Sequence, residues 1–173
     1  MPLASVGTAL QSGMTKKRPP EPLNLHDWNS LVAAFQRESD RGAALLAAGF
    51  VERQLLVYLR ELSVDPSLHD RLFGPTGALS SFSQQIASAR AFDLISREMY
   101  NRLEAIRQVR NHFAHHPFQT SFDDAAVVKH VDKVRGTFDH VVDRRTWFLL
   151  TCAIAGLQLD LHDGSGLAEA RRR

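Results

Sequence analysis

The sequence predicts an all-α protein, a single bundle of five or six helices. Almost every segment between residues 24 and 162 has apolar side chains three or four positions apart, which is the period of a helix. No run of alternating β-branched residues indicates a strand. A chain of 173 residues, 44% of them hydrophobic, is long enough to bury a core without disulfides or metal. We expect one helical domain over residues 24–163, between a flexible N-terminal arm (1–23) and a flexible basic tail (164–173).

Two helices precede a long loop. The second, about 40–62, is apolar around most of its circumference, which is typical of the central helix of a bundle. Two prolines and two glycines then predict a loop over 63–80. The first helix begins near residue 24 or 27, and its apolar side consists of Trp28, Leu31, Val32 and Phe35.

Serine residues mark the start of the next two helices. Ser81, with Gln84 three positions later, forms a capping box. Ser96 can cap a helix that runs to about residue 115, with Ile95 and Tyr100 as a hydrophobic staple. This second helix must end there, because a proline at position 117 disfavours helical backbone in the residue before it. The helix that begins at the capping box is expected to bury Phe82, Ile86, Ala89 and Phe92.

Two further helices complete the predicted bundle. Ser121 and Asp124 can start a helix whose stripe continues past a weak point at Gly136. That stripe consists of Val127, Val131, Val134, Phe138 and Val141. The last helix spans about 145–161 and is expected to turn inward Trp147, Leu150, Ile154 and Leu161.

Composition narrows the function classes. A formal net charge of +2 produces no strong field for nucleic acid over the whole molecule, so any basic surface must be local. Cys152 is the only cysteine, which excludes a disulfide framework or a cysteine-based zinc site within one chain. The apolar run 147–157 is shorter than the about 20 residues that a membrane span needs. With no secretory signal pattern, we expect a cytoplasmic protein without a membrane partner.

The end of the helix 96–115 carries the candidate chemistry. Arg110 lies seven residues after Leu103 and three before Phe113, which places it on the buried stripe, where an arginine needs a partner. Glu52 lies on an apolar line of the second helix, so a buried or semi-buried Arg110–Glu52 pair would satisfy both residues. Other candidate partners at these two sites are Glu38, Asp40 and Arg41.

Several polar side chains surround Arg110. Asn111 and His115 are four apart and project side by side. The candidate substrate-binding residues around them are Arg107, His112 and His116. A simpler interpretation is that cations at a helix C-terminus interact with its dipole, for about 0.3–1 kcal/mol each. His112 and His116 have the spacing of metal ligands, and Asp123 or Asp124 could be a further ligand. The following proline makes His116 an unreliable helical ligand and no carboxylate is suitably spaced to support its ring, so we expect no metal and no cofactor.

The order Arg110, Asn111, His115 resembles the signature of the HEPN superfamily, an Arg, a polar residue and a His a few positions later. Three longer blocks look like the mannitol-operon repressor family: "ESDRGAALLAAGFVE" (38–52), "FSQQIASARAFDLIS" (82–96) and "YNRLEAIRQVRNHFAHH" (100–116). The resemblance covers roughly residues 30–130. It implies a HEPN-like helical bundle that pairs into a homodimer.

The resemblance implies two functions. Catalytic HEPN proteins are metal-independent endoribonucleases that join Arg and His from two protomers. In that case two copies of His115 serve as base and acid, Arg110 holds the phosphate, and Asn111 orients His115 or the phosphate. RNA cleavage would then leave 2′,3′-cyclic phosphate ends. The alternative is a noncatalytic, mannitol-operon-repressor-type transcriptional regulator. The sequence has no helix-turn-helix for direct DNA binding, so it would act through a protein partner, a regulator or an antitoxin.

Overall fold

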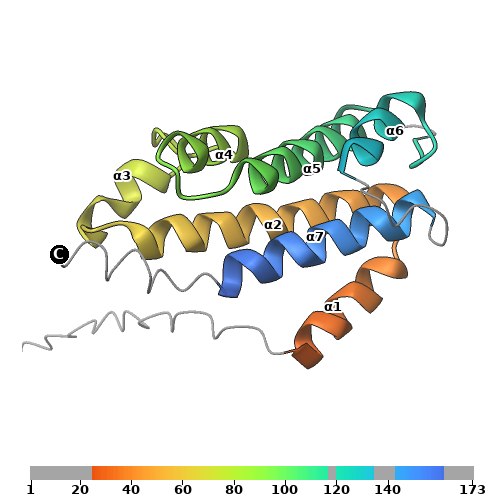
Figure 1. Cartoon of the computed structure of the whole chain (residues 1–173), viewed down its shortest axis with the longest axis horizontal. Helices are drawn as coiled ribbons and strands as arrows, with labels where there is room; N and C mark the ends of the chain where they lie inside the picture. Colours follow the sequence, from red (N-terminus) through yellow and green to blue (C-terminus); the bar gives the residue numbers. More distant parts are fainter. Residues whose placement is uncertain (1–24, 117–119, 135–142, 162–173) are drawn as a thin grey trace, which may run out of the picture.

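The computed structural model describes residues 25–116, 120–134 and 143–161, and all regular structure in these ranges is helical (Figure 1). This confirms the all-α prediction. The predicted tails lie outside the described residues. Five helices have ten or more residues, and two α-helices and two 3-10 turns are shorter. In chain order they are α1 Leu25–Gln36, α2 Asp40–Leu62, η1 Pro66–Leu68, α3 His69–Phe73, α4 Phe82–Ala91, α5 Arg97–His115, α6 Ala125–Val131, η2 Asp132–Val134 and α7 Arg144–Leu161.

Helix α2 is the central helix, as its sequence predicts. It begins where the Ser39 hydroxyl accepts a hydrogen bond from the Gly42 amide, and it packs against α1, α4, α5 and α7. Its length and apolar composition would also allow it to cross a membrane, but half of that apolar window is buried in the bundle. A core helix of a soluble protein passes the same test of length and composition.

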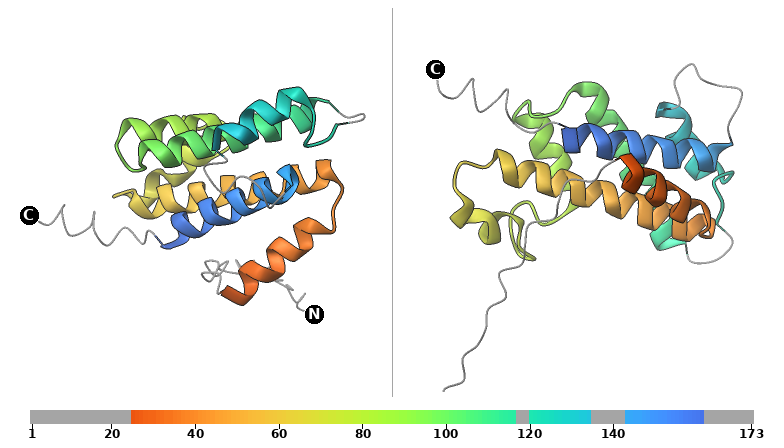
Figure 2. Two further views of the ribbon diagram at one scale, coloured as in Figure 1. Left: turned by 45° about the vertical axis from the view of Figure 1, so that its right-hand side comes forward. Right: turned by 90° about the horizontal axis from the view of Figure 1, so that it is seen from below.

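The helices form layers around the core. Helices α2 and α7 lie side by side, α4, α5 and α6 lie along one side of that pair, and α1 lies on the other (Figures 1 and 2). The core between α2 and α5 contains large side chains with almost no exposed surface. They include Val51, Leu55, Leu103, Ile106 and Phe113. Helix α5 therefore has one face fixed in the core, and its other faces remain available to solvent or to α6.

The segment between α2 and α4 is partly helical rather than a plain loop. Pro66 lies at the start of η1, where proline is tolerated because its missing N–H has no helical partner. Helix α4 begins with the predicted capping box of Ser81 and Gln84. The expected burial of Phe92 is wrong, since 74% of its surface is exposed. It follows the end of α4, where Asp93 takes a positive φ of 55°, as the residue after a helix often does.

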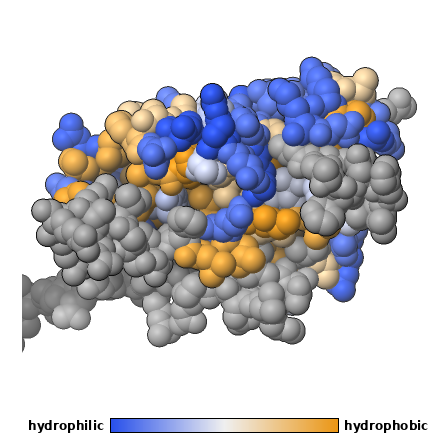
Figure 3. Space-filling model, in the orientation of Figure 1, coloured by the Kyte–Doolittle hydropathy of each residue, from blue (hydrophilic) through white to orange (hydrophobic). Residues whose placement is uncertain are grey.

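The predicted inward face of α7 is wrong for three of its four residues, whereas Trp147 does pack against the core. Leu150, Ile154 and Leu161 are 37%, 46% and 69% exposed, although the helix has the predicted range to within one residue. The opposite face is buried, through Phe148, Leu149, Cys152, Ala155 and Leu159. Both faces have an apolar stripe at helical spacing, so the period alone could not identify the one that packs on α2. Apolar surface along α7 is visible in Figure 3.

Helix α6 is shorter than the predicted helix. Val127 and Val131 are buried as expected, but the α-helix ends at Val131 and continues as the 3-10 turn η2. Phe138, Val141 and the predicted weak point at Gly136 lie outside the described residues.

Candidate functional site

Helix α5 carries the predicted motif to the edge of the bundle. The Ser96 hydroxyl accepts a hydrogen bond from the Met99 amide at 3.1 Å, which fixes the start of the helix. The buried stripe then holds the helix along α2 and α4, so its last turn projects at a defined place. The helix ends at His115, and the His116 amide donates to the carbonyl oxygen of His112 at 3.0 Å.

Arg110 forms the predicted pair with Glu52. Its Nη2 lies 3.3 Å from Glu52 Oε2, and its Nη1 donates to Asn111 Oδ1 at 3.1 Å. The pair is semi-buried rather than sealed, because the side chain of Arg110 is 38% exposed and that of Glu52 is 28% exposed. Arg110 lies at the edge of the buried stripe, where a long side chain can reach solvent. Asn111 thus contacts Arg110 and helps to hold its guanidinium in place.

His115 is exposed on the last turn of α5. Its ring has no hydrogen-bond or ion-pair partner among the described residues, so its two nitrogens are available to solvent or to a ligand. The His115 ring therefore does not cap α5, because it bonds to no carbonyl oxygen of the described residues. His116 has that role instead, because its Nδ1 lies 2.9 Å from the carbonyl oxygen of His112.

His112 and His116 belong to a different cluster from Arg110. Their rings stack with centroids 4.3 Å apart, and His112 Nε2 lies 3.4 Å from Asp124 Oδ2 at the start of α6. The His116 carbonyl oxygen accepts hydrogen bonds from Arg41 at 3.4 Å and from Thr120 at 3.3 Å. These contacts tie the end of α5 to α2 and α6. They give both histidines a structural role beside the candidate ligand role.

Arg107 is held by its own helix. Its Nη2 and Nε lie 2.9 Å and 3.2 Å from the two carboxylate oxygens of Glu104. This bidentate pair neutralises both charges locally and occupies two of the guanidinium donors. As a phosphate ligand, Arg107 would have to share its guanidinium with Glu104.

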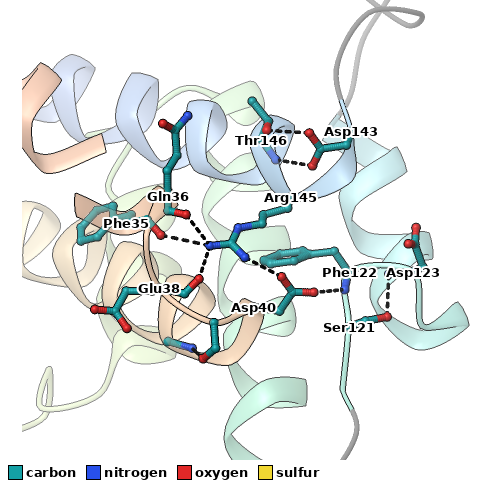
Figure 4. Close-up of polar contacts among 12 residues, drawn as sticks. Phe35, Gln36, Glu38, Asp40, Ser121, Phe122, Asp123, Asp143, Arg145 and Thr146 are labelled. Carbon is teal, nitrogen blue, oxygen red and sulfur yellow. Dashed lines mark hydrogen bonds and ion pairs between the residues drawn. The ribbon is translucent and has the colours of Figure 1, made fainter. Parts of the chain in front are cut away.

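Asp40 and Glu38 are not partners of Arg110, which corrects that part of the prediction. Arg145 at the start of α7 binds both: its Nη1 donates to Asp40 Oδ1 at 2.8 Å, and its Nη2 faces the main-chain carbonyl of Glu38 (Figure 4). The same Nη2 lies 3.3 Å and 3.0 Å from the carbonyl oxygens of Phe35 and Gln36 at the end of α1. The other Asp40 oxygen accepts from the Phe122 amide at 3.4 Å, so this corner joins α1, α2 and α7 to the segment before α6.

His130 on α6 faces the middle of α5, where it lines a groove with Glu104 and Gln108. Burial lowers the pKa of His130, and the nearby charges of Lys129, Lys133 and His112 lower it further. These neighbours disfavour protonation of His130 unless an anion binds close to it. Within the described ranges, no group of three or more His, Cys, Asp or Glu side chains is placed to hold a metal ion.

The predicted site residues are therefore divided between two neighbouring groups on one helix end. Arg110, Asn111 and Glu52 form one contact network, and His112, His116 and Asp124 form the other. His115 lies in the same turn without a described partner. Sequence reasoning considered Asp124 only as a metal ligand or helix cap and did not predict its pairing with His112. Comparison with protein-family models, with characterised proteins and with solved structures gives no significant match.

Proposed function

We propose that this chain is a cytoplasmic, metal-independent endoribonuclease of the HEPN type that acts as a homodimer. One observation carries the proposal. The last turn of α5 combines a partly exposed arginine, oriented by Glu52 and Asn111, with an exposed histidine that has no described partner. Arg110 and His115 are the residue types that a phosphate-transfer reaction requires, and both can reach solvent.

The reaction needs only these groups. A base removes the proton of the RNA 2′-hydroxyl, the 2′-oxygen bonds to the neighbouring phosphorus, and the bond from phosphorus to the 5′-oxygen breaks. An acid protonates that leaving oxygen, so the products are a 2′,3′-cyclic phosphate and a 5′-hydroxyl. His115 of one protomer is the base and His115 of its partner is the acid, since an imidazole nitrogen can accept a proton in one protomer and donate one in the other.

Arg110 stabilises the negative charge that grows on the nonbridging oxygens. Its guanidinium has five N–H donors, of which Glu52 and Asn111 engage two, so donors remain for a phosphate. The Glu52 carboxylate holds the arginine in one orientation but also competes with the phosphate for its charge. Asn111 is a positioning residue in this arrangement, because its oxygen accepts from Arg110.

Cleavage of labelled total RNA in EDTA tests the proposal. We expect wild type to cleave and to leave cyclic phosphate ends, while His115→Ala loses activity by about 100-fold or more. His115 is exposed, so this variant should keep the circular dichroism spectrum of wild type. His69→Ala, on the remote helix α3, is the matched control and should cleave normally. Equal cleavage by wild type and His115→Ala would disprove the assignment.

The second candidate is a noncatalytic regulator that works through protein contacts. The exposed face of α7 favours it, because Leu150, Ile154 and Leu161 are spaced four and seven apart along one side of the helix. Apolar surface of this kind often marks a protein interface. Intact RNA after incubation with well-folded wild type, together with loss of a regulatory partner in Ile154→Gln, would favour this candidate over the ribonuclease.

A further inference from the structure

A groove lies between α5 and the α6–η2 segment, apart from the Arg110 network. Its volume is about 410 Å³, enough for part of a nucleotide chain or a small ligand. Its described polar and aromatic lining residues are Tyr100, Asn101, Glu104, Gln108, His130 and Lys133. Hydrophilic residues dominate the surface over α5 and α6 in Figure 3.

The lining supplies three kinds of contact that single-stranded RNA uses. An aromatic ring can stack on a base, amides can bond to base edges, and a lysine can neutralise a phosphate. Tyr100 supplies the ring, Asn101 and Gln108 the amides, and Lys133 the cation. None of these four side chains forms a hydrogen bond or ion pair with another described residue, so their polar groups are available.

Among the described lining residues Glu104 is the only acidic one, and it does not repel a phosphate strongly. Glu104 is paired with Arg107 through both carboxylate oxygens, which cancels its charge at short range. His130 adds a group that can take a proton when an anion is bound. The local balance of the groove is therefore neutral to positive, although the whole chain carries a formal charge of only +2.

The groove lies on the same side of α5 as the proposed catalytic residue His115. Asn101, Gln108 and His115 follow one another at intervals of seven residues, so they lie along one side of α5. Seven residues of helix correspond to roughly 10 Å. A strand that occupies the groove beside Gln108 can thus continue along the same side of the helix to His115.

We propose that this groove binds the single-stranded RNA segment next to the cleaved bond, with a base stacked on Tyr100 and a phosphate at Lys133. The inference rests on the proposed ribonuclease function, since it supplies the substrate contacts of that site. It gives a function to Asn101 and Gln108, which lie about four and about two turns before His115 on the same side of α5.

The test measures binding of a fluorescent, 2′-O-methylated single-stranded oligonucleotide, which lacks the attacking hydroxyl and cannot be cleaved. Tyr100→Leu keeps an apolar side chain but loses the ring, and we expect about tenfold weaker binding. Tyr100→Phe keeps the ring and should bind like wild type. Lys133→Gln should weaken binding about threefold and lower the salt slope by about one phosphate contact. Lys129→Gln makes the same charge change on α6 outside the groove lining and is the matched control.

The outcomes separate this inference from the proposed function. Equal binding by Tyr100→Leu and Tyr100→Phe, or equal loss in Lys133→Gln and Lys129→Gln, would overturn the groove even if unmodified RNA is cleaved through His115. Binding with the expected pattern, together with intact unmodified RNA, would support the groove and reject the ribonuclease. Absence of oligonucleotide binding by wild type would overturn the proposal that the groove binds RNA. Thermal unfolding by circular dichroism checks that Tyr100→Leu is folded.

Discussion

Two arginines at helix ends serve different purposes in this molecule. Arg145 directs its guanidinium at Asp40 and at carbonyl oxygens of the α1–α2 turn, and its side chain is 25% exposed. Arg110 makes two contacts, with Glu52 and Asn111, and is 38% exposed. The guanidinium of Arg145 is engaged in contacts between helices, whereas that of Arg110 retains free N–H donors. The comparison shows how an arginine whose contacts join several helices differs from one that keeps donors for solvent or for the proposed phosphate ligand.

The largest effect is expected at Arg145. Arg145→Ala removes the Asp40 pair and leaves carbonyl oxygens at the end of α1 without a donor, so we expect a loss of about 2 kcal/mol in the free energy of unfolding. Its neighbour Arg144 pairs with Asp123, which is 80% exposed, and Arg144→Ala should cost about 0.5 kcal/mol or less. Urea unfolding measures both. Equal losses would show that Arg145 does not anchor this corner.

Arg110 should contribute less to stability. A sealed pair would cost about 3 kcal/mol on loss of one partner, but solvent reaches both Arg110 and Glu52, so we expect about 1 kcal/mol for either alanine variant. A double-mutant cycle in urea gives the coupling between them, which we expect at about 0.5 kcal/mol. A loss for Arg110→Ala as large as that for Arg145→Ala would make Arg110 a structural residue and weaken the ribonuclease proposal.

Local sequence signals predicted the motif helix well. The Ser96 cap, the spacing of Leu103, Ile106 and Phe113, and the proline at 117 gave both its ends and its buried side. The Arg110–Glu52 pair was predictable for a similar reason: each residue interrupts an apolar line, so each needed a partner.

Two other features could not be predicted in this way. The Asp40–Arg145 pair joins residues 105 positions apart, and neither residue interrupts an apolar line, so no local pattern marks them. Helix α7 has apolar stripes on both sides, and its contacts with α1, α2, α5 and α6 decide which side is buried. Sequence periodicity reports that a face is apolar, but the neighbouring helices determine whether it is covered.

A charge change at Glu52 sharpens the contrast between the two arginines. Glu52→Gln keeps an oxygen that can accept from Arg110 but removes the negative charge that competes with phosphate. We expect the uncleavable oligonucleotide to bind about threefold more tightly, with a loss of less than about 1 kcal/mol in stability. The matched variant Asp40→Asn, at Arg145, should leave binding unchanged. Weaker binding by Glu52→Gln would mean that the carboxylate is needed to orient Arg110 for its ligand.

The smallest effect concerns His130 and pH. Because burial and the neighbouring charges of Lys129, Lys133 and His112 lower its pKa in the folded state, the unfolded chain binds a proton more readily. His130 therefore lowers stability as the pH falls below about 6.5, the ordinary histidine value, and has no such effect well above it. The thermal midpoint of wild type should fall more than that of His130→Gln between about pH 7 and pH 5. Bound oligonucleotide should reduce this difference, because a phosphate in the groove favours the protonated ring. Parallel curves of thermal midpoint against pH for the two proteins would show that folding does not lower the pKa of His130.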